Sequence, residues 1–213
     1  VGLSMLIAAP IGAAASQVGT LIMWATEQAP FLMGILVSVI VGVALTLPIS
    51  SAAICAALGL TGLAGGAAVA GCCAQMIGFA VMSYKENGVG GLVSQGLGTS
   101  MLQMGNIVKN PRIWIAPTLA SAITGPLATC VFHFEMNGAA VSSGMGTCGL
   151  VGQIGVYTGW VSDIAAGTKA AITPMDWAAM VLLCFVLPAV LSVIFCEIER
   201  KLGWIKEGDL KLN

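Results

Sequence analysis

The stretch that decides the fold spans residues 133–155 and reads His-Phe-Glu-Met-Asn-Gly-Ala-Ala-Val-Ser-Ser-Gly-Met-Gly-Thr-Cys-Gly-Leu-Val-Gly-Gln-Ile-Gly. It contains the single histidine of the chain, an acid two residues later and an asparagine two residues after that. An uncharged apolar run leads into it, and a glycine-rich segment leads out. The surrounding sequence therefore predicts a hydrophobic scaffold that holds one polar stretch at membrane depth.

The composition indicates a membrane protein. Apolar residues make up 58% of the 213 residues and charged residues 8%, whereas soluble domains carry about 25% charged residues. So few charges cannot cover a soluble surface of this size, and lipid is the expected solvent. The net charge of −1 leaves no basic footprint, which excludes nucleic acid as a partner. With one histidine and no Cys-x-x-Cys, the seven cysteines predict buried apolar side chains rather than a metal site.

Apolar runs predict an all-α, polytopic membrane protein with about five spanning helices plus re-entrant or interfacial segments. The runs cover residues 1–24, 31–58, 62–84, 113–134 and 177–198. In the second run, Pro48 is followed by two serines, so we expect the helix to bend or break there. In the third, Gly62 and Gly66 have the spacing of closely packed membrane helices.

We expect residues 1–213 to form a single transmembrane domain. The chain begins Val-Gly-Leu, without Met or a basic segment, so its start does not resemble a signal peptide. Helices upstream of it could be missing.

Positive charge predicts the topology. Lys109 and Arg112 flank one turn, and Arg200 and Lys201 close the last apolar run. The positive-inside rule places both clusters in the cytoplasm, which requires an even number of crossings between them. Residues 135–160 must then be re-entrant. In this arrangement Lys169 would lie on the non-cytoplasmic side of the membrane, which the positive-inside rule disfavours.

Residues 88–108 mix apolar, amide and glycine residues. Two interpretations stay open for this segment, an amphipathic surface helix and a re-entrant segment buried in protein.

Glu135 is the candidate centre of a ligand site. It is the only acid between Glu86 and Asp163. With Asn137 and His133 it could bind a sugar or polyol, because a carboxylate accepts hydrogen bonds while asparagine and histidine can also donate them. A buried carboxylate is costly unless it is satisfied, so we expect this site to lie inside the protein. An interfacial Glu at a helix end, and a structural histidine, stay open as alternatives.

Other polar side chains extend the set of candidate ligand residues. These are Gln95, Gln103, Asn106 and Gln153. A helix starting near residues 142–146 would direct its N–H groups towards the ligand. The Gly-x-Gly-x-x-Gly pattern at 144–149 follows an apolar membrane run and not a strand, so it does not indicate a dinucleotide site. We expect no catalytic residue, metal or cofactor.

Two segments resemble a known family. They are residues 94–117, Ser-Gln-Gly-Leu-Gly-Thr-Ser-Met-Leu-Gln-Met-Gly-Asn-Ile-Val-Lys-Asn-Pro-Arg-Ile-Trp-Ile-Ala-Pro, and residues 135–155, which include Gly-Met-Gly-Thr-Cys-Gly-Leu-Val-Gly-Gln-Ile at 144–154. Both are similar to phosphotransferase-system sugar transporter subunit IIC-like membrane proteins, and the likeness extends over most of the chain. We expect fewer spans than in characterised members and no appended IIB domain.

The resemblance implies a fold, a function and partners. Two re-entrant hairpins, at 88–108 and 135–160, would cradle a sugar with Glu135 facing it, in a homodimer. Cytoplasmic phosphotransferase subunits would carry out phosphate transfer. The location would be the bacterial plasma membrane, with the C-terminus in the cytoplasm.

Three functions are compatible with the sequence. The first is a permease subunit that binds and translocates a sugar or a related polar small molecule. The second is a non-transporting membrane sensor or regulator on the same fold. The third is an ion- or proton-coupled carrier or channel, in which Glu135 carries charge. No sequence feature separates them.

Overall fold

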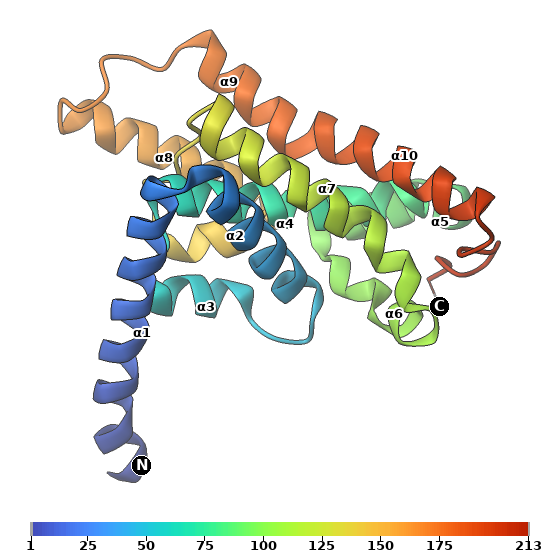
Figure 1. Ribbon diagram of the computed structural model, residues 1–213, viewed down its shortest axis with the longest axis horizontal. Coiled ribbons are helices and arrows are strands. Elements are labelled where there is room, and N and C mark those ends of the chain that lie inside the picture. Colours follow the sequence, from blue (N-terminus) through green and yellow to red (C-terminus); the bar gives the residue numbers. More distant parts are fainter. Residues whose placement is uncertain (1, 213) are drawn as a thin grey trace.

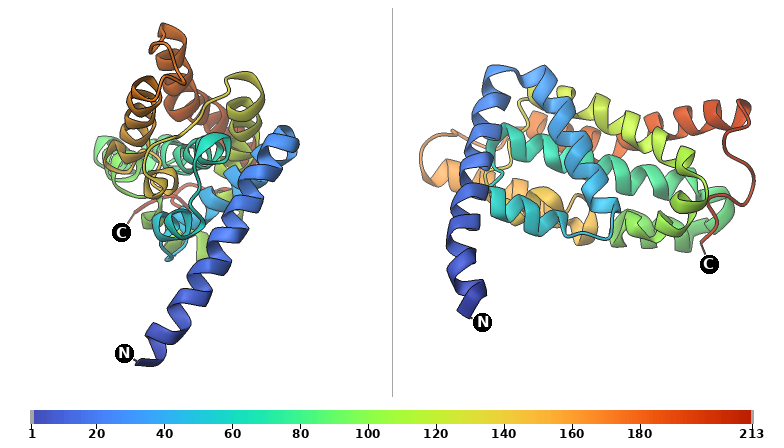
Figure 2. Two further views of the ribbon diagram at one scale, coloured as in Figure 1. Left: turned by 90° about the vertical axis from the view of Figure 1, so that its left-hand side faces the viewer. Right: turned by 60° about the horizontal axis from the view of Figure 1, so that its bottom comes forward.

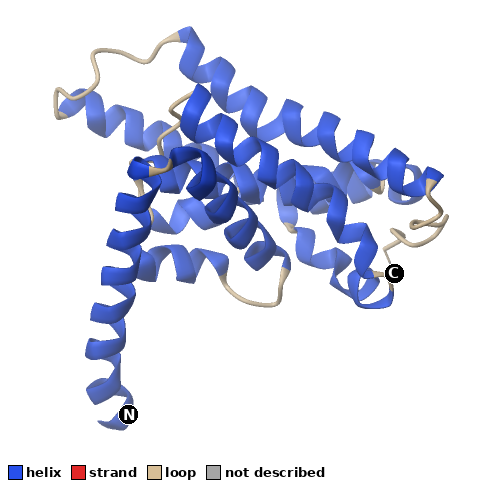
Figure 3. Cartoon of the chain, in the orientation of Figure 1, coloured by secondary structure: helices blue, strands red, loops and turns tan. Residues whose placement is uncertain are grey.

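The computed structural model describes residues 2–212, and these residues form helices joined by short connections (Figure 3). The structure is 79% helical, and the described residues contain no strand. Three helices, Gly62–Met82, Pro111–Val131 and Pro174–Lys201, are long and apolar enough to cross a membrane. The all-α membrane fold predicted from the sequence is confirmed.

The longer helices are α1 (Gly2–Gln28), α2 (Pro30–Thr46), α4 (Gly62–Met82), α7 (Ile115–Pro126), α8 (Val151–Ala165) and α10 (Leu187–Lys201). The shorter ones are α3 (Ser51–Leu58), α5 (Tyr84–Val93), α6 (Met104–Lys109) and α9 (Pro174–Val181). π-Helical turns continue α5, α7 and α9 over Ser94–Gly98, Leu127–Val131 and Leu182–Val186. The last of these joins α9 and α10 into one helix along the molecule (Figure 1).

Helix α4 is the centre of the fold. Its residues 64–76 are all buried, and α2, α7 and α10 pack around it. Its glycines allow other backbones to come very close. A Cβ at Gly66 would collide with the carbonyl of Phe134, and one at Gly71 with the carbonyl of Ser38. The predicted packing of Gly62 and Gly66 against another helix was wrong, because the backbone next to Gly66 is the non-helical segment at Phe134 and Gly62 begins α4 with a positive φ of 61°.

The second apolar run is broken at the predicted place. Helix α2 ends at Thr46 and α3 begins at Ser51, with Pro48 in the connection. Proline cannot donate the helical hydrogen bond, and its ring crowds the preceding turn. Ser50 then caps α3 by accepting a hydrogen bond from the amide of Ala53 at 3.2 Å.

Helix α1 stands at a steep angle to the remaining helices (Figures 1 and 2).

Residues 84–109 form a helical hairpin, which we call the first hairpin. Its outgoing limb is α5 with its π-helical turn, and its returning limb is the 3₁₀ turn Ser100–Gln103 followed by α6. The helix is interrupted at Thr99, whose φ of −159° and ψ of 141° are extended. The segment is therefore not one continuous amphipathic helix. Its re-entry into a membrane stays a prediction.

Residues 133–165 form the second hairpin. An extended segment and two short 3₁₀ turns, Ala140–Gly144 and Cys148–Leu150, lead out, and α8 returns. The helix start predicted near residues 142–146 was wrong, because α8 begins at Val151. Gly146 and Gly149 each have a φ of 53°, which interrupts a helix in this region. The tips of the two hairpins meet where the Thr147 hydroxyl donates to the Gly96 carbonyl.

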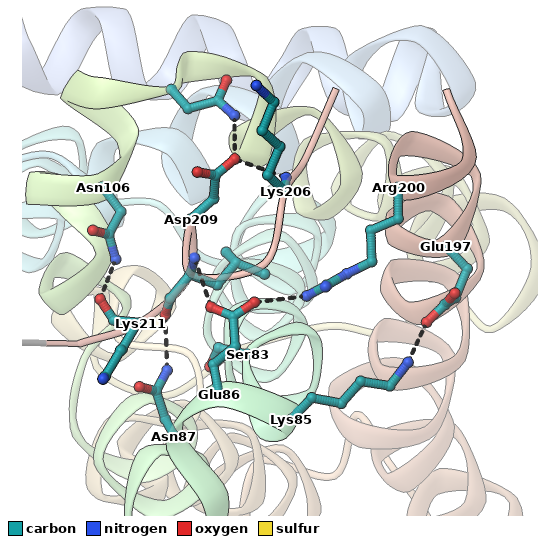
Figure 4. A network of polar contacts seen from close by, with 12 residues as sticks. Ser83, Lys85, Glu86, Asn87, Asn106, Glu197, Arg200, Lys206, Asp209 and Lys211 are labelled. Atoms are coloured by element: carbon teal, nitrogen blue, oxygen red, sulfur yellow. Dashed lines mark hydrogen bonds and ion pairs between the residues drawn. The ribbon is translucent and has the colours of Figure 1, made fainter. Parts of the chain in front are cut away.

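Residues 202–212, which we call the return segment, fold back from α10 onto the first hairpin (Figure 4). Asn110 donates to the Trp204 carbonyl at 2.9 Å, and the Arg112 guanidinium lies 5.6 Å from the Trp204 ring centroid. The two basic clusters therefore lie at the same end of the molecule, as the charge pattern predicts. The compartment that this end faces stays a prediction.

Candidate functional site

A cavity of about 540 Å³ opens at the end of the molecule opposite to the return segment. The two ends are separated by the helix Pro174–Lys201, whose 28 residues extend over about 40 Å. We call this cavity the carboxylate pocket. Its polar lining residues are His133, Glu135, Asn137, Asp163, Thr168, Lys169 and Asp176, and its apolar lining includes Phe134 and Trp160.

Extended backbone places two of these side chains together. Successive side chains of an extended segment point to opposite sides, so Glu135 and Asn137 share one face. Phe134 and Met136, on the other face, are buried. The segment is fixed to the start of α4, because the amides of Met136 and Gly62 each donate to the other residue's carbonyl at 3.0 Å.

An amide joins two carboxylates across the hairpin. The Asn137 Nδ2 donates to Glu135 Oε2 at 3.0 Å and to Asp163 Oδ2 at 2.9 Å. Asp163 lies near the end of α8, which returns beside the extended segment. That close return depends on Gly159, because a Cβ at this position would lie only 2.8 Å from the backbone nitrogen of Asn137.

The opposite wall carries one ion pair and an aromatic cluster. Lys169 Nζ lies 2.7 Å from Asp176 Oδ1 and 5.5 Å from the centroid of the Trp160 ring. Trp160 is buried and packs edge-to-face on Trp177, with ring centroids 5.6 Å apart. Asp176 also caps α9, where it accepts a hydrogen bond from the backbone amide of Thr173 at 2.7 Å. The wall is therefore fixed to the start of a long helix.

A family model described as Phosphotransferase system, EIIC matches residues 1–212. The chain belongs to this family. EIIC domains are membrane components of transporters, which agrees with the helices that are long and apolar enough to cross a membrane. A comparison with curated proteins and one with solved structures each gave no match.

Three of the candidate residues that the sequence predicts for this EIIC chain line one cavity, namely His133, Glu135 and Asn137. The expectation that Glu135 lies inside the protein was wrong, since its side chain is exposed. The reason is that the extended segment runs along the molecular surface, with Phe134 and Met136 facing inwards. His133 is also exposed and has a φ of 43°, in the left-handed region.

The remaining candidates lie elsewhere in the EIIC chain. Gln95, Gln103 and Asn106 are buried in a hydrogen-bond network under the return segment. Gln103 and Asn106 donate to backbone carbonyls of that segment at 2.9 Å and 3.0 Å. Gln153 donates to the Cys73 sulfur at 3.2 Å, and its own Oε1 is buried without a partner among the described residues. None of these four side chains lines the carboxylate pocket.

The sequence-based prediction omitted most of the other pocket residues, among them Trp160 and the polar residues Asp163, Thr168, Lys169 and Asp176. The predicted topology could have indicated these residues. If residues 135–160 enter and leave the membrane on the same side, the loop after them lies at the same end of the molecule as Glu135. The described residues contain no group of three or more His, Cys, Asp or Glu side chains that could hold a metal ion.

Proposed function

We propose that this EIIC-family chain binds a sugar or polyol in the carboxylate pocket and translocates it across the membrane. The observation that carries the proposal is the Glu135–Asn137–Asp163 arrangement facing the buried Trp160 in one cavity. Its volume of about 540 Å³ lies within the roughly 300–1,000 Å³ of small-molecule sites.

The pocket offers the hydrogen-bonding groups that hydroxyls need. Asn137 uses both amide hydrogens of Nδ2 on the two carboxylates, and this fixes the carboxylate positions. Each carboxylate has a second oxygen that can accept from a sugar hydroxyl, and such charge-assisted bonds are stronger than neutral ones. The ring of Trp160 supplies an apolar surface for the less polar face of a sugar.

Translocation requires the two hairpins to move apart. Their tips meet at Thr147 and Gly96 in the interior of the molecule, and we propose that this contact closes the route between the pocket and the other end. Broken helices and hairpins at membrane depth are typical of transporter pathways. We propose that the first and second hairpins are re-entrant, that the chain acts as a homodimer, and that cytoplasmic phosphotransferase subunits phosphorylate the released sugar.

The test combines binding and flux. Purified chain is titrated with a panel of hexoses and polyols by calorimetry, and uptake of any compound that binds is measured in proteoliposomes. Because Glu135 is exposed, we expect Glu135→Gln to weaken binding about tenfold, the low end for loss of a charge-assisted bond. Glu207→Gln is the matched control, since Glu207 is exposed and belongs to the return segment at the opposite end.

The outcomes separate the candidate functions. Binding with uptake, both reduced by Glu135→Gln alone, supports a permease. Binding without uptake indicates the sensor or regulator. Uptake that follows a pH or ion gradient indicates the coupled carrier. A ligand that Glu135→Gln and the Glu207→Gln control bind as tightly as the wild type would place the binding site outside the carboxylate pocket.

A further inference from the structure

We infer that the carboxylate pocket selects its ligand by charge. It admits neutral sugars, binds ammonium-bearing sugars more tightly, and rejects sugar acids and sugar phosphates. This inference rests on the proposed function, because it names the class of sugar that the same pocket takes.

The charge balance of the pocket is the first argument. Its lining contains three carboxylates, from Glu135, Asp163 and Asp176, and one ammonium, from Lys169. With His133 neutral, the lining carries a net charge of −2 (one positive and three negative groups). A ligand carboxylate in this cavity would therefore meet an excess of like charge.

The single ammonium is already occupied. Lys169 Nζ lies 2.7 Å from Asp176 Oδ1 and over the ring of Trp160 at 5.5 Å. An anionic ligand would have to break this ion pair before Lys169 could bind it. Sites that recognise carboxylate or phosphate groups commonly present a free arginine fork, and no arginine lines this pocket within the described residues.

The two remaining carboxylates are the attractive element for a cation. Glu135 and Asp163 are held towards each other by the Asn137 amide, and nothing cationic among the described residues pairs with either of them. An ammonium group on the sugar would lie between the two negative carboxylates, which are at present bridged only by the neutral amide of Asn137. A phosphate, with about −1.5 to −2 charges, would be the least favourable substituent. A phosphorylated product is therefore expected not to bind again in this pocket.

The test uses two matched series of sugars. Glucose, glucosamine and glucuronate, and the corresponding galactose compounds, are titrated into purified chain by calorimetry at low salt. A buffer at neutral pH keeps the carboxylates ionised and most of the amine protonated. We expect each uronate to bind at least about tenfold more weakly than its parent sugar, and each amino sugar to bind more tightly, from the repulsion or attraction of unit charges a few ångströms apart. High salt should narrow both differences.

A double variant tests the assigned residues. In Glu135→Gln/Asp163→Asn, the uronate and the parent sugar should differ by less than about threefold, even if all affinities fall. Glu207→Gln should keep the wild-type ratios. Equal binding of uronate and parent sugar by the wild type would overturn the inference and leave the proposed function intact. Discrimination that persists in the double variant would also overturn it. Absence of binding in both series would refute hexose binding itself, and the inference with it.

Discussion

Replacing Leu210 by alanine should loosen the return segment from the first hairpin. Leu210 is fully buried and packs with Phe79, Ile107 and Ile113. Shortening a buried leucine to alanine costs about 2–5 kcal/mol. The segment is also held by five hydrogen bonds between its backbone and side chains of the first hairpin, each worth about 1 kcal/mol net. In Leu210→Ala, the return segment should therefore bind the first hairpin more weakly but not come away from it completely.

The lower end of that range gives a measurable effect. A loss of about 2 kcal/mol raises the undocked population about 30-fold. Trypsin cleavage after Lys206 reports this population, because cleavage of a transiently opened segment follows the opening equilibrium when closing is fast. Fragments are identified by mass spectrometry, and a melting curve confirms that the helices remain folded.

The chain contains a matched control for this prediction. Leu202 belongs to the same segment but is 58% exposed, so Leu202→Ala removes the same atoms without leaving a cavity. Cleavage after Lys206 should stay at the wild-type rate in Leu202→Ala and rise in Leu210→Ala. If both variants are cleaved at the wild-type rate, Leu210 does not hold the segment, and the docking argument is wrong.

Three further predictions concern packing, charge and topology. Gly66→Ala should lower the melting temperature by several degrees, since overpacking costs about 1–3 kcal/mol, whereas Gly98→Ala, which meets open space, should change it little. Arg200→Gln should destabilise the protein more than Lys85→Gln, because the Arg200–Glu86 side chains are 16% and 10% exposed and the Lys85–Glu197 pair is 70% and 46% exposed; equal melting temperatures would contradict this ranking. Single cysteines at positions 110 and 206, in a background without native cysteines, should be labelled by an impermeant reagent from the same side of the membrane, and labelling from opposite sides would contradict the topology.

The local part of the candidate site follows from the sequence. Glu135 and Asn137 are two residues apart, and an extended segment places such side chains on one face. Asp163, 26 residues away from its partner Asn137, reaches the pocket only because α8 returns beside the extended segment at Gly159. Lys169 and Asp176 complete the pocket because the loop after α8 leads into α9. Contacts at this separation depend on the path of the chain and not on local backbone preference.

The amide side chains of the first hairpin also have partners that the local sequence does not predict. Gln103 and Asn106 resemble ligand-binding side chains in sequence because they interrupt an apolar segment. In the structure they donate to carbonyls of the return segment. An irregular backbone that is buried against other elements needs hydrogen-bond partners for its polar groups. The sequence does not indicate which segments will be paired in this way.

The sequence by itself determined the solvent, the helical class and the break in the second apolar run. Low charge content excludes a water-covered fold, apolar runs of this length favour helices, and Pro48 with the two serines after it favours a break in the second run. Only the tertiary structure decided which polar residues share the carboxylate pocket and which hold the return segment. The physical reason is that composition and local sterics act within a few residues, whereas the partner of a distant carboxylate or amide is set by how closely packed backbones, such as those at Gly66 and Gly159, bring separate segments together.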